Sequence, residues 1–432
     1  MAEGANLGKR SEFKMDTNIK KYIEELCKSV KESAAKLAIL KTDKKNQALM
    51  KIAEKLTANT AEIIAANEID IANADINGVP KTMIDRLTLN EKRIKDIADS
   101  LSEVCTLADP IGSGETLVRP NGLKITRIHV PLGVIAIICE SRPNVTVDAV
   151  ALCVKSGNAV IIRGGKEAIN TNRVLMKLMR NALDEIGINK NCIALVDDVT
   201  REGTLYLMQM REYVDVLIPR GNIGLINSVI ENAKIPVIET GVGNCHVYID
   251  NFADMETAVN VAVNAKVSRP SVCNAAETIL VHAAVADEFL PKFADGVKPW
   301  NVELRGCDRT KSVLPDITPA TEDDYYKEYN DYICAVKIVD SIDEAIAHIN
   351  KYNTFHSEAI ITKDIANAEK FKIEVDAAAV YVNASTRFTD GGVFGLGAEI
   401  GISTQKLHVR GPMGLKELTT VKYIIDGDGQ VR

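Results

Sequence analysis

Short apolar runs alternate with longer amphipathic runs through the middle of the chain. Each apolar run is rich in Val and Ile and is bounded by polar residues or glycine, the pattern of a strand that is buried on both faces. Between residues 134 and 240 the predicted strands are Val134–Cys139, Ala159–Ile162, Cys192–Val196, Val214–Ile218 and Pro236–Ile238, and the predicted helices are Val147–Lys155, Ala168–Ile186, Glu202–Met210 and Ile223–Asn232. Strand–helix alternation with right-handed crossovers predicts a parallel, doubly wound sheet.

The segments on either side extend this α/β pattern. Residues 18–109 carry apolar positions at three- and four-residue spacing, which predicts helices. After residue 241 the predicted strands are His246–Ile249, Thr278–Val281, Ala335–Val339, Ala359–Ile361 and Ala379–Val382, and the predicted helices are Met255–Val267, Ile342–Tyr352 and Ile365–Ile373. The span Pro291–Tyr332 shows neither period and is predicted to be irregular. We therefore expect two doubly wound α/β domains, 15–114 with 132–240 and 241–405.

A strand pair interrupts the first domain. Apolar and polar residues alternate on both sides of Asn121-Gly122 within 115–131, and Asn-Gly favours a two-residue type I′ hairpin turn. A hairpin alone is only marginally stable. The end of the chain, 412–432, also alternates over Leu418–Ile425 and is the natural partner of the hairpin. We expect the hairpin and tail to form an oligomerisation element, and hence a homo-oligomer.

Composition narrows the class of protein. The 432 residues are 46% hydrophobic and 26% charged, as in globular proteins. The net charge of −7 gives no reason to expect nucleic acid or an anionic membrane as a partner. Nine cysteines without a Cys-x-x-Cys pair suit a reducing compartment, so we expect the cytoplasm and assign no metal site. We interpret 1–14 as a possible tag, with Met15 as the natural start.

The loop around Cys273 is the main candidate for covalent chemistry. Pro270 argues against helix just before the cysteine. Lys266 and Arg269 lie nearby in sequence, and a neighbouring cation lowers a thiol pKa toward the nucleophilic thiolate. The alternative is that Cys273 is a small buried hydrophobe, as most free cysteines are.

Polar and glycine residues follow each predicted strand of the first sheet, where such sheets bind ligands. The turn Arg220-Gly221-x-x-Gly224 opens a helix N-terminus to a phosphate, although an ordinary tight turn explains it equally well. Arg163 and Lys166 follow the second strand, and cations there suit the 2′-phosphate of NADP(H). Glu167 can instead bind NADH, and Lys166 can simply be solvated. Asn144 suits an oxyanion donor or a helix cap.

Long motifs carry a family resemblance. They are VPLGVIAIICESRPNVTVDA (130–149), SGNAVIIRGGKEA (156–168), IPVIETGVGNCHVYID (235–250), RPSVCNAAET (269–278), VYVNASTRFTDGG (380–392) and FGLGAEIGISTQKLHVRGPMGL (394–415). On these motifs the chain resembles the aldehyde dehydrogenase superfamily, and within it the gamma-glutamyl phosphate reductase family. The resemblance implies an aldehyde dehydrogenase-like fold, with 15–114 and 132–240 as the dinucleotide-binding domain and 241–405 as the catalytic domain.

The resemblance also implies roles for individual residues. Cys273 corresponds to the nucleophile and Asn144 to an oxyanion donor. The resemblance assigns cofactor contacts to Arg163, Gly221, Gly224 and Glu328, and we add Gly164 and Lys166 beside Arg163. Independently of the resemblance, the basic residues nearest the reacting loops in sequence, and hence the candidates for binding the substrate, are Arg142, Lys266 and Arg269. Glu239 resembles the water-activating glutamate of hydrolytic relatives, but its Glu-Thr-Gly-Val-Gly context departs from their Glu-Leu-Gly-Gly.

The implied reaction is the NADPH-dependent reduction of gamma-glutamyl phosphate (L-glutamate 5-phosphate) to L-glutamate 5-semialdehyde and phosphate. It proceeds through a cysteine thioester and is the second step of proline biosynthesis. A glutamate 5-kinase is a possible partner that delivers the substrate. The alternatives are an aldehyde-oxidising or CoA-acylating relative, and a scaffold protein that keeps the fold without catalysis.

Overall fold

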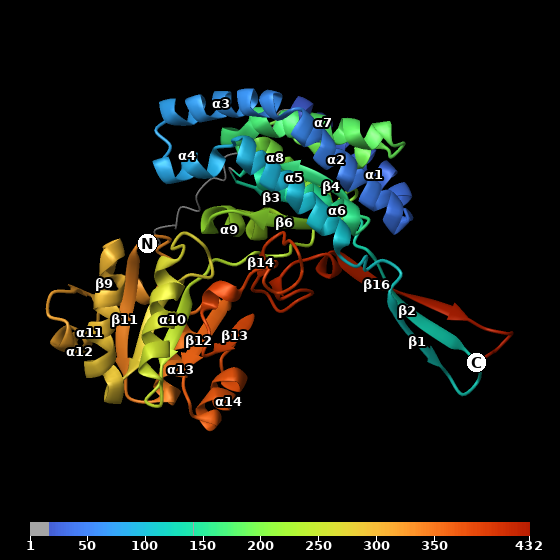
Figure 1. Cartoon of the computed structure of the whole chain (residues 1–432). Helices are drawn as coiled ribbons and strands as arrows, with labels where there is room; N and C mark the ends of the chain where they lie inside the picture. The colour runs from blue at the N-terminus through green and yellow to red at the C-terminus, as the bar shows by residue number, and fades with distance from the viewer. Residues whose placement is uncertain (1–16, 141) are drawn as a thin grey trace, which may run out of the picture.

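The computed structural model describes residues 17–140 and 142–432, so the interpretation of 1–14 as a tag and of Met15 as the start lies outside the described residues. Figure 1 shows two α/β units, one above the other, and an arm that extends away from both. The α/β fold class with two sheets and a hairpin is thereby confirmed. None of the described helices has the length and apolar character needed to cross a membrane.

The first sheet has the strand order β5-β4-β3-β6, and all its strands are parallel. Its strands are β3 (Val134–Cys139), β4 (Ala159–Arg163), β5 (Ile193–Leu195) and β6 (Val216–Arg220). The predicted fifth strand is reduced to one bridge between Leu217 and Val237, because Pro236 has no N–H to extend the pairing. From β3 the chain adds β4 and β5 on one side and then β6 on the other. The order of the strands therefore reverses between β3 and β6, and ligands bind at such a point.

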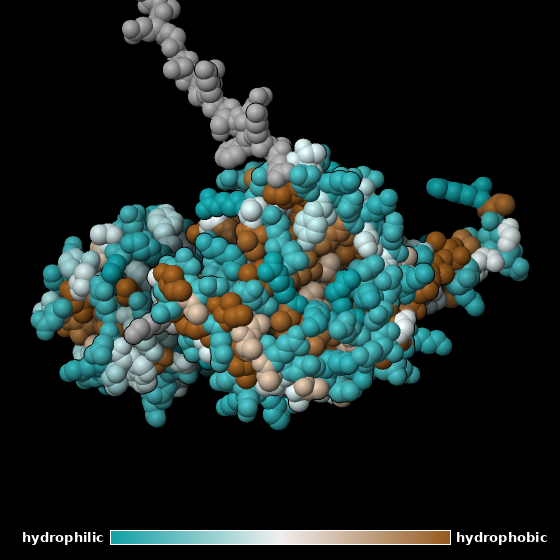
Figure 2. Space-filling model, turned by 90° about the horizontal axis from the view of Figure 1, so that it is seen from above, coloured by the Kyte–Doolittle hydropathy of each residue, from teal (hydrophilic) through white to brown (hydrophobic). Residues whose placement is uncertain are grey.

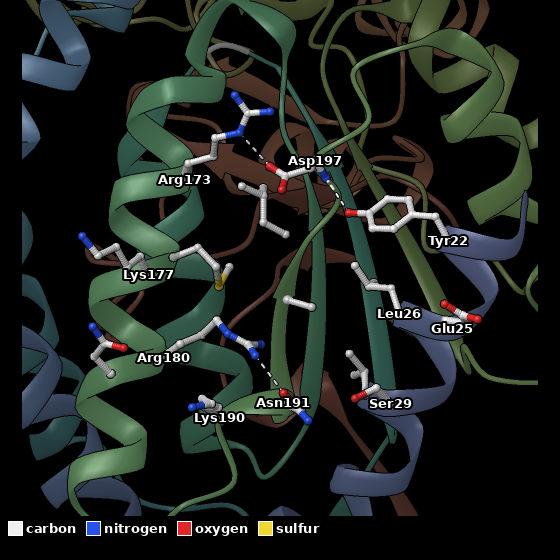
Figure 3. A pocket seen from close by; sticks show the side chains of 15 residues that line it. Tyr22, Glu25, Leu26, Ser29, Arg173, Lys177, Arg180, Lys190, Asn191 and Asp197 are labelled. Carbon is white, nitrogen blue, oxygen red and sulfur yellow. Dashed lines mark hydrogen bonds and ion pairs between the residues drawn. The ribbon is translucent and has the colours of Figure 1, made fainter. Parts of the chain in front are cut away.

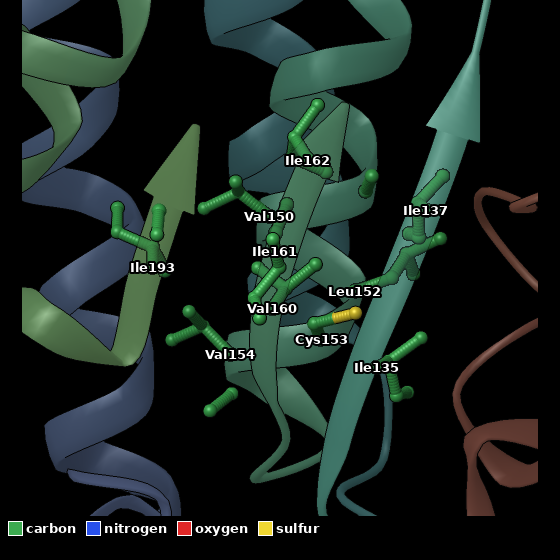
Figure 4. Packing of buried hydrophobic residues seen from close by; sticks show 14 of the residues in the cluster. Ile135, Ile137, Val150, Leu152, Cys153, Val154, Val160, Ile161, Ile162 and Ile193 are labelled. Carbon is green, nitrogen blue, oxygen red and sulfur yellow. The ribbon is translucent and has the colours of Figure 1, made fainter. Parts of the chain in front are cut away.

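Helices cover both faces of this sheet. The crossover helices are α6 (Pro143–Lys155), α7 (Ile169–Glu185), α8 (Arg201–Gln209) and α9 (Ile223–Asn232). The N-terminal helices are α1 (Thr17–Ala38), α2 (Thr42–Ala58), α3 (Thr60–Ile76), α4 (Lys81–Leu87) and α5 (Glu91–Thr106). Helix α1 packs on the strands, and α2 packs on α5 and α7. Figure 4 shows how Val150 and Val154 of α6 pack beside Ile161 of β4 in this core.

The second sheet is also parallel and has the order β10-β9-β11-β8-β7-β12-β13. Its strands are β7 (Cys245–Ile249), β8 (Ala276–His282), β9 (Glu303–Gly306), β10 (Thr318–Pro319), β11 (Ile333–Val339), β12 (Ser357–Ile361) and β13 (Ala379–Val382). Its helices are α10 (Met255–Val267), α11 (Ala286–Val297), α12 (Asp308–Val313), α13 (Ile342–Tyr352) and α14 (Ile365–Glu374).

The prediction that Pro291–Tyr332 is irregular is wrong. Helix α11 continues through Pro291, and β9 and β10 form one edge of the second sheet. A proline inside a helix and two very short strands remove the periodicity on which the prediction depended.

The chain returns to the first unit near its end. Strands β14 (Ile402–Ser403) and β15 (Gly411–Pro412) pair with each other, and Ser403 bridges to Thr240. Ile400 and Met413 are buried in the core of the first unit. The chain therefore passes from the second unit back to the first before residue 405, the predicted end of the catalytic domain.

The arm is a three-stranded antiparallel sheet of β1 (Gly114–Val118), β2 (Lys124–Pro131) and β16 (Thr419–Asp426). The predicted pairing of tail and hairpin is confirmed, but the type I′ turn is wrong. Gly122 has φ +89°, whereas Asn121 does not have positive φ. The turn instead closes from Gly122 N to Arg119 O at 2.9 Å, because Pro120 has the fixed negative φ that suits its second position.

Apolar side chains gather on the arm, where Figure 2 shows a hydrophobic surface away from the main body. Leu117, Val118, Tyr423, Ile424 and Ile425 are all exposed there. Contiguous exposed apolar surface of this kind marks interaction sites.

Candidate active site

Cys273 lies in the loop between α10 and β8, as the sequence predicts. The start of β7 holds this loop closely. The Sγ of Cys245 donates to the Cys273 carbonyl oxygen at 3.1 Å. A Cβ on Gly243 would fall 1.4 Å from that same oxygen, so only glycine allows the two backbones to approach. The peptide that carries the candidate nucleophile is therefore fixed by its neighbours.

The electrostatic environment of Cys273 differs from the prediction. The pKa of the Cys273 thiol is raised to about 12, first by burial and then by the carboxylates of Glu328 and Glu399. Arg220, the last residue of β6, acts in the opposite direction. The prediction that flanking cations lower this pKa is wrong, because burial and the two carboxylates outweigh the cation.

Lys266 is directed away from the loop and into the second unit. Its Nζ donates to Glu277 Oε2 at 2.5 Å, and both side chains are fully buried. The other Glu277 oxygen accepts from Asn330 N at 3.2 Å. Burial raises the pKa of Glu277 to about 7, although Lys266 opposes this shift. This ion pair removes Lys266 from the residues that can contact a substrate.

Arginines from four parts of the chain surround the loop instead. Arg142 precedes α6, and its pKa is lowered to about 10 by burial and then by Arg86, Arg220 and Arg269. Arg86 donates from Nη2 to Ser271 O at 3.0 Å. None of these four arginines forms an ion pair with the side chains that the structure describes, and Arg220 Nη1 is buried without a partner there. Arginines without an ion-pair partner form a strong site for anions.

Asn144 lies in the first turn of α6. Its Nδ2 donates to Asp148 Oδ2 at 3.3 Å, one turn further along the helix. The helix begins at Pro143 and not near Val147, because proline is favoured at the first helical position. The cap interpretation of Asn144 therefore fails. Its second amide hydrogen has no partner among the described residues, so it can donate to a developing oxyanion.

The predicted cofactor residues after β4 differ in whether the protein itself holds them or leaves them open to a ligand. Arg163 donates from Nη2 to Val199 O at 2.7 Å and to Thr200 O at 3.1 Å, so it holds the loop after β5. Its Nε is buried without a partner among the described residues. Lys166 is exposed beyond the strand and free to contact a ligand. Gly164 is buried, and a Cβ there would fall 2.4 Å from the Asn172 amide.

The carboxylate of Glu140 lies against the glycine turn that follows β6. Glu140 Oε1 accepts from Asn222 N at 3.2 Å, and a Cβ on Gly221 would lie 2.6 Å from the Glu140 carboxyl carbon. Asn222 caps α9 by accepting from Leu225 N. Gly221 is thus explained by the approach of Glu140, whereas Gly224 lies on the open first turn of α9.

Two further glutamates were singled out in the sequence. Glu328 Oε1 accepts from Gly243 N at 2.8 Å, which places it beside the Cys273 loop. Glu239 is half-buried, and its backbone N–H donates to Gln405 Oε1 at 3.0 Å.

Another cavity lies away from this loop. It has a volume of about 640 Å³ and opens at the free edge of β5, between α1 and α7. Figure 3 shows Tyr22 and Arg173 reaching toward Asp197 at one end of it, and both contacts are hydrogen bonds. Within the described ranges no group of three His, Cys, Asp or Glu side chains is placed to hold a metal ion.

Comparison with known proteins decides the family. The model of the aldehyde dehydrogenase family matches residues 13–333 and 327–424. A gamma-glutamyl phosphate reductase from Halothermothrix orenii is 56% identical over 96% of this chain and 99% of its own length. The chain belongs to the gamma-glutamyl phosphate reductases of the aldehyde dehydrogenase family.

Solved structures agree with this family. The crystal structure of a gamma-glutamyl phosphate reductase from Thermotoga maritima superposes with a TM-score of 0.93 at 50% identity, covering 95% of this chain and 99% of that one. A glyceraldehyde-3-phosphate dehydrogenase from Methanocaldococcus jannaschii, complexed with NADP, has a TM-score of 0.67 at 16% identity, covering 95% of each chain. The second likeness concerns the fold alone.

Three residues of the site carry no assigned role in the sequence prediction. The sequence contains a signal for Asp148, because this residue lies four positions after Asn144 and residues at that spacing share a helix face. Arg86 has none, because it meets Ser271 across 185 positions of sequence. Glu399 lies within a motif that matches the family. The sequence does not show that its charge raises the Cys273 pKa, because this effect depends on the return of the chain to the first unit.

Proposed function

We propose that the protein reduces gamma-glutamyl phosphate to glutamate 5-semialdehyde and phosphate with NADPH, as the second step of proline biosynthesis. Membership of the reductase family supports the substrate. The observation that carries the proposal is the set of unpaired arginines around the fixed loop of Cys273. An acyl phosphate that also has an α-carboxylate brings two anionic ends, and unpaired guanidinium groups suit both.

The chemistry assigned to Cys273 is acyl transfer. Its thiolate attacks the acyl carbon, the C–O bond to phosphate breaks, and phosphate leaves as an anion toward the arginines. Asn144 and the Cys273 backbone N–H hold the oxyanion that forms in each tetrahedral stage. After reduction, the thiohemiacetal collapses to the semialdehyde and frees the thiol. Water must be excluded, since hydrolysis of the thioester would lose the acyl group.

The thiol must lose a proton before it attacks. With a pKa of about 12, only a minute fraction is thiolate at neutral pH. The Glu399 carboxyl is the suited acceptor because burial raises its pKa to about 6 and its charge is among those that raise the pKa of the thiol. Glu328 adds negative charge but also holds Gly243 N. We assign proton acceptance to Glu399 and loop positioning to Glu328.

NADPH supplies the hydride when it is bound. The residues present fit such a cofactor at one end: Lys166 is exposed beyond β4, and the buried Nε of Arg163 has no partner among the described residues. Lys166 would bind the 2′-phosphate, with Arg163 shaping the loop beside it. Gly224 at the first turn of α9 would face the pyrophosphate. The Glu140 carboxylate lies beside Gly221. It would have to move, or share its hydrogen-bond donor with the pyrophosphate.

The test is the reverse reaction. Glutamate 5-semialdehyde and NADP are supplied with phosphate, with coenzyme A or with neither, and the formation of NADPH is followed by its absorbance. We expect turnover that requires phosphate. Turnover with water alone would identify an aldehyde-oxidising enzyme, and turnover with coenzyme A would identify an acylating one. Binding of NADP without turnover under any condition would favour the scaffold alternative.

The arm supports the proposal of a homo-oligomer. Its exposed apolar residues, among them Tyr423 and Ile425, would be covered by a second copy of the chain. Replacing Ile425 by Asp should lower the mass measured by light scattering, while an oligomer of unchanged mass would place the interface elsewhere. A glutamate 5-kinase partner and a cytoplasmic location stay predictions from the sequence.

A further inference from the structure

A cavity of about 410 Å³ opens beside Asn144, and it is separate from the residues assigned to the cofactor. Helices α4 and α5, the start of α6 and the loop before Cys273 enclose it. Its lining includes four arginines and one inner carboxylate, Asp148. Arg93 is paired with Asp85, which leaves three arginines, Arg86, Arg142 and Arg269, without an ion-pair partner among the described side chains. Arg86 also contacts the backbone of Ser271, two residues before the candidate nucleophile. A ligand in this cavity is therefore adjacent to the reacting loop.

Asp148 is poorly compensated in this cavity. The two hydrogen bonds that it accepts from described residues are long: Asn144 Nδ2 donates at 3.3 Å and Ser100 Oγ at 3.5 Å. Asp148 enters no ion pair with the described side chains. Burial raises its pKa to about 6, although Asn144, Arg220 and Ser100 act in the opposite direction, as expected for a carboxylate whose loss of water is only partly compensated. A carboxylate in this condition is suited to bind a cationic ligand group.

We propose that Asp148 binds the α-ammonium group of the substrate, while the three arginines bind its α-carboxylate. This assignment rests on the proposed function, because only an amino-acid substrate carries both charges beside a reacting acyl group. The cavity then recognises the end of the substrate that does not react. Glutamyl substrates are preferred over otherwise identical molecules that lack the amino group.

The same contact protects the thioester. A neutral α-amino group can reach its own γ-acyl carbon in a five-membered ring. The new C–N bond forms as the C–S bond to Cys273 breaks, the amine proton passes to the thiolate, and 5-oxoproline leaves. An ammonium paired with Asp148 has no lone pair and is held away from the acyl carbon. The acyl group then survives until it is reduced.

The experiment compares two substrates in the reverse reaction with phosphate and NADP. Glutamate 5-semialdehyde carries the amino group, and 5-oxopentanoate lacks only that group. Asp148→Asn should lower the ratio of the two kcat/KM values by about tenfold to a hundredfold. Any change in the alignment of Asn144 affects both substrates and cancels in the ratio. Asp96→Asn, on the exposed rim of the same cavity, is the matched control and should keep the wild-type ratio.

Two further measurements support or overturn the proposal. Without phosphate, Asp148→Asn should release more 5-oxoproline per active site than Asp96→Asn does. In the wild type, glutamate should inhibit at least about tenfold better than glutarate. This comparison does not depend on whether a variant folds. An unchanged substrate ratio in Asp148→Asn, or equal inhibition by glutamate and glutarate, would overturn the assignment. A wild type without phosphate-dependent turnover would instead refute the proposed function.

Discussion

Removing the Lys266 amine should destabilise the protein strongly without a specific effect on substrate binding. In Lys266→Met the Glu277 carboxylate stays fully buried but loses its ion-pair partner. Breaking a buried pair in this way costs about 3–5 kcal/mol. For a unit of roughly this size each kcal/mol lowers Tm by about 2–4 °C, so we expect the melting temperature of the second unit to fall by about 6–20 °C.

The double variant Lys266→Met/Glu277→Leu is the matched control. It removes both charges and keeps apolar volume in the same place, so most of the lost stability should return. Differential scanning calorimetry measures Tm for the wild type and both variants. Below the melting transition, the KM for phosphate in the reverse reaction should stay near the wild-type value in each variant.

The stability of Lys266→Met should depend on pH, and the direction of this dependence follows from the pKa of Glu277. Without the lysine, burial is opposed only by the hydrogen bond from Asn330 N among the main causes, so the folded-state pKa of Glu277 lies above the unfolded value near 4.3. The native variant then binds a proton that the unfolded chain releases, so the variant is most stable at low pH and loses stability as pH rises through the folded pKa. The Tm deficit should therefore be smaller at pH 5 than at pH 8. An unchanged Tm with a raised KM for phosphate would refute this reasoning and return Lys266 to the substrate site.

Three other changes test the site. Asn144→Ala should lose about 10²–10³ in kcat with a small change in KM, as for other oxyanion donors; a normal kcat would remove Asn144 from the mechanism. Lys166→Ala should lower the NADPH-to-NADH ratio of kcat/KM about tenfold or more, and an unmoved ratio would place the 2′-phosphate contact elsewhere. Alkylation of Cys273 by iodoacetamide, measured by peptide mass spectrometry, should accelerate about tenfold per pH unit from 7 to 9.5 without a plateau, because the thiolate fraction rises throughout this range below a pKa of about 12. A plateau below pH 9 would show that the pKa is not raised.

The sequence predicted the parts of the fold that depend on periodicity. Val134–Cys139 is a strand with the predicted bounds, and α10 spans the predicted Met255–Val267, because long apolar runs and regular spacing leave few alternatives. The turn at Asn121-Gly122 was mispredicted because Pro120 competes for the position of the turn. Local propensity alone does not decide between two overlapping turns.

The candidate site was predictable as far as it is built from adjacent residues. The position of Cys273 in a loop follows from the residues around it, but the direction of the Lys266 side chain does not. Lys266 is near Cys273 in sequence, yet the last turns of α10 direct its amine toward Glu277. Arg86 is remote in sequence and reaches the loop only through tertiary packing. Glu140 beside Gly221 likewise depends on the adjacency of β3 and β6 in the sheet.

The measurement that tests the central claim most directly is the pre-steady-state burst of the reverse reaction. The wild type is mixed rapidly with glutamate 5-semialdehyde and NADP in the absence of phosphate. If Cys273 forms the thioester, NADPH should appear in a burst of about one equivalent per active site and then nearly stop, and added phosphate should restore turnover. Cys273→Ala, with NADP binding and Tm near those of the wild type, should show no burst. Continuous phosphate-free turnover, or a burst of equal size in Cys273→Ala, would contradict the account.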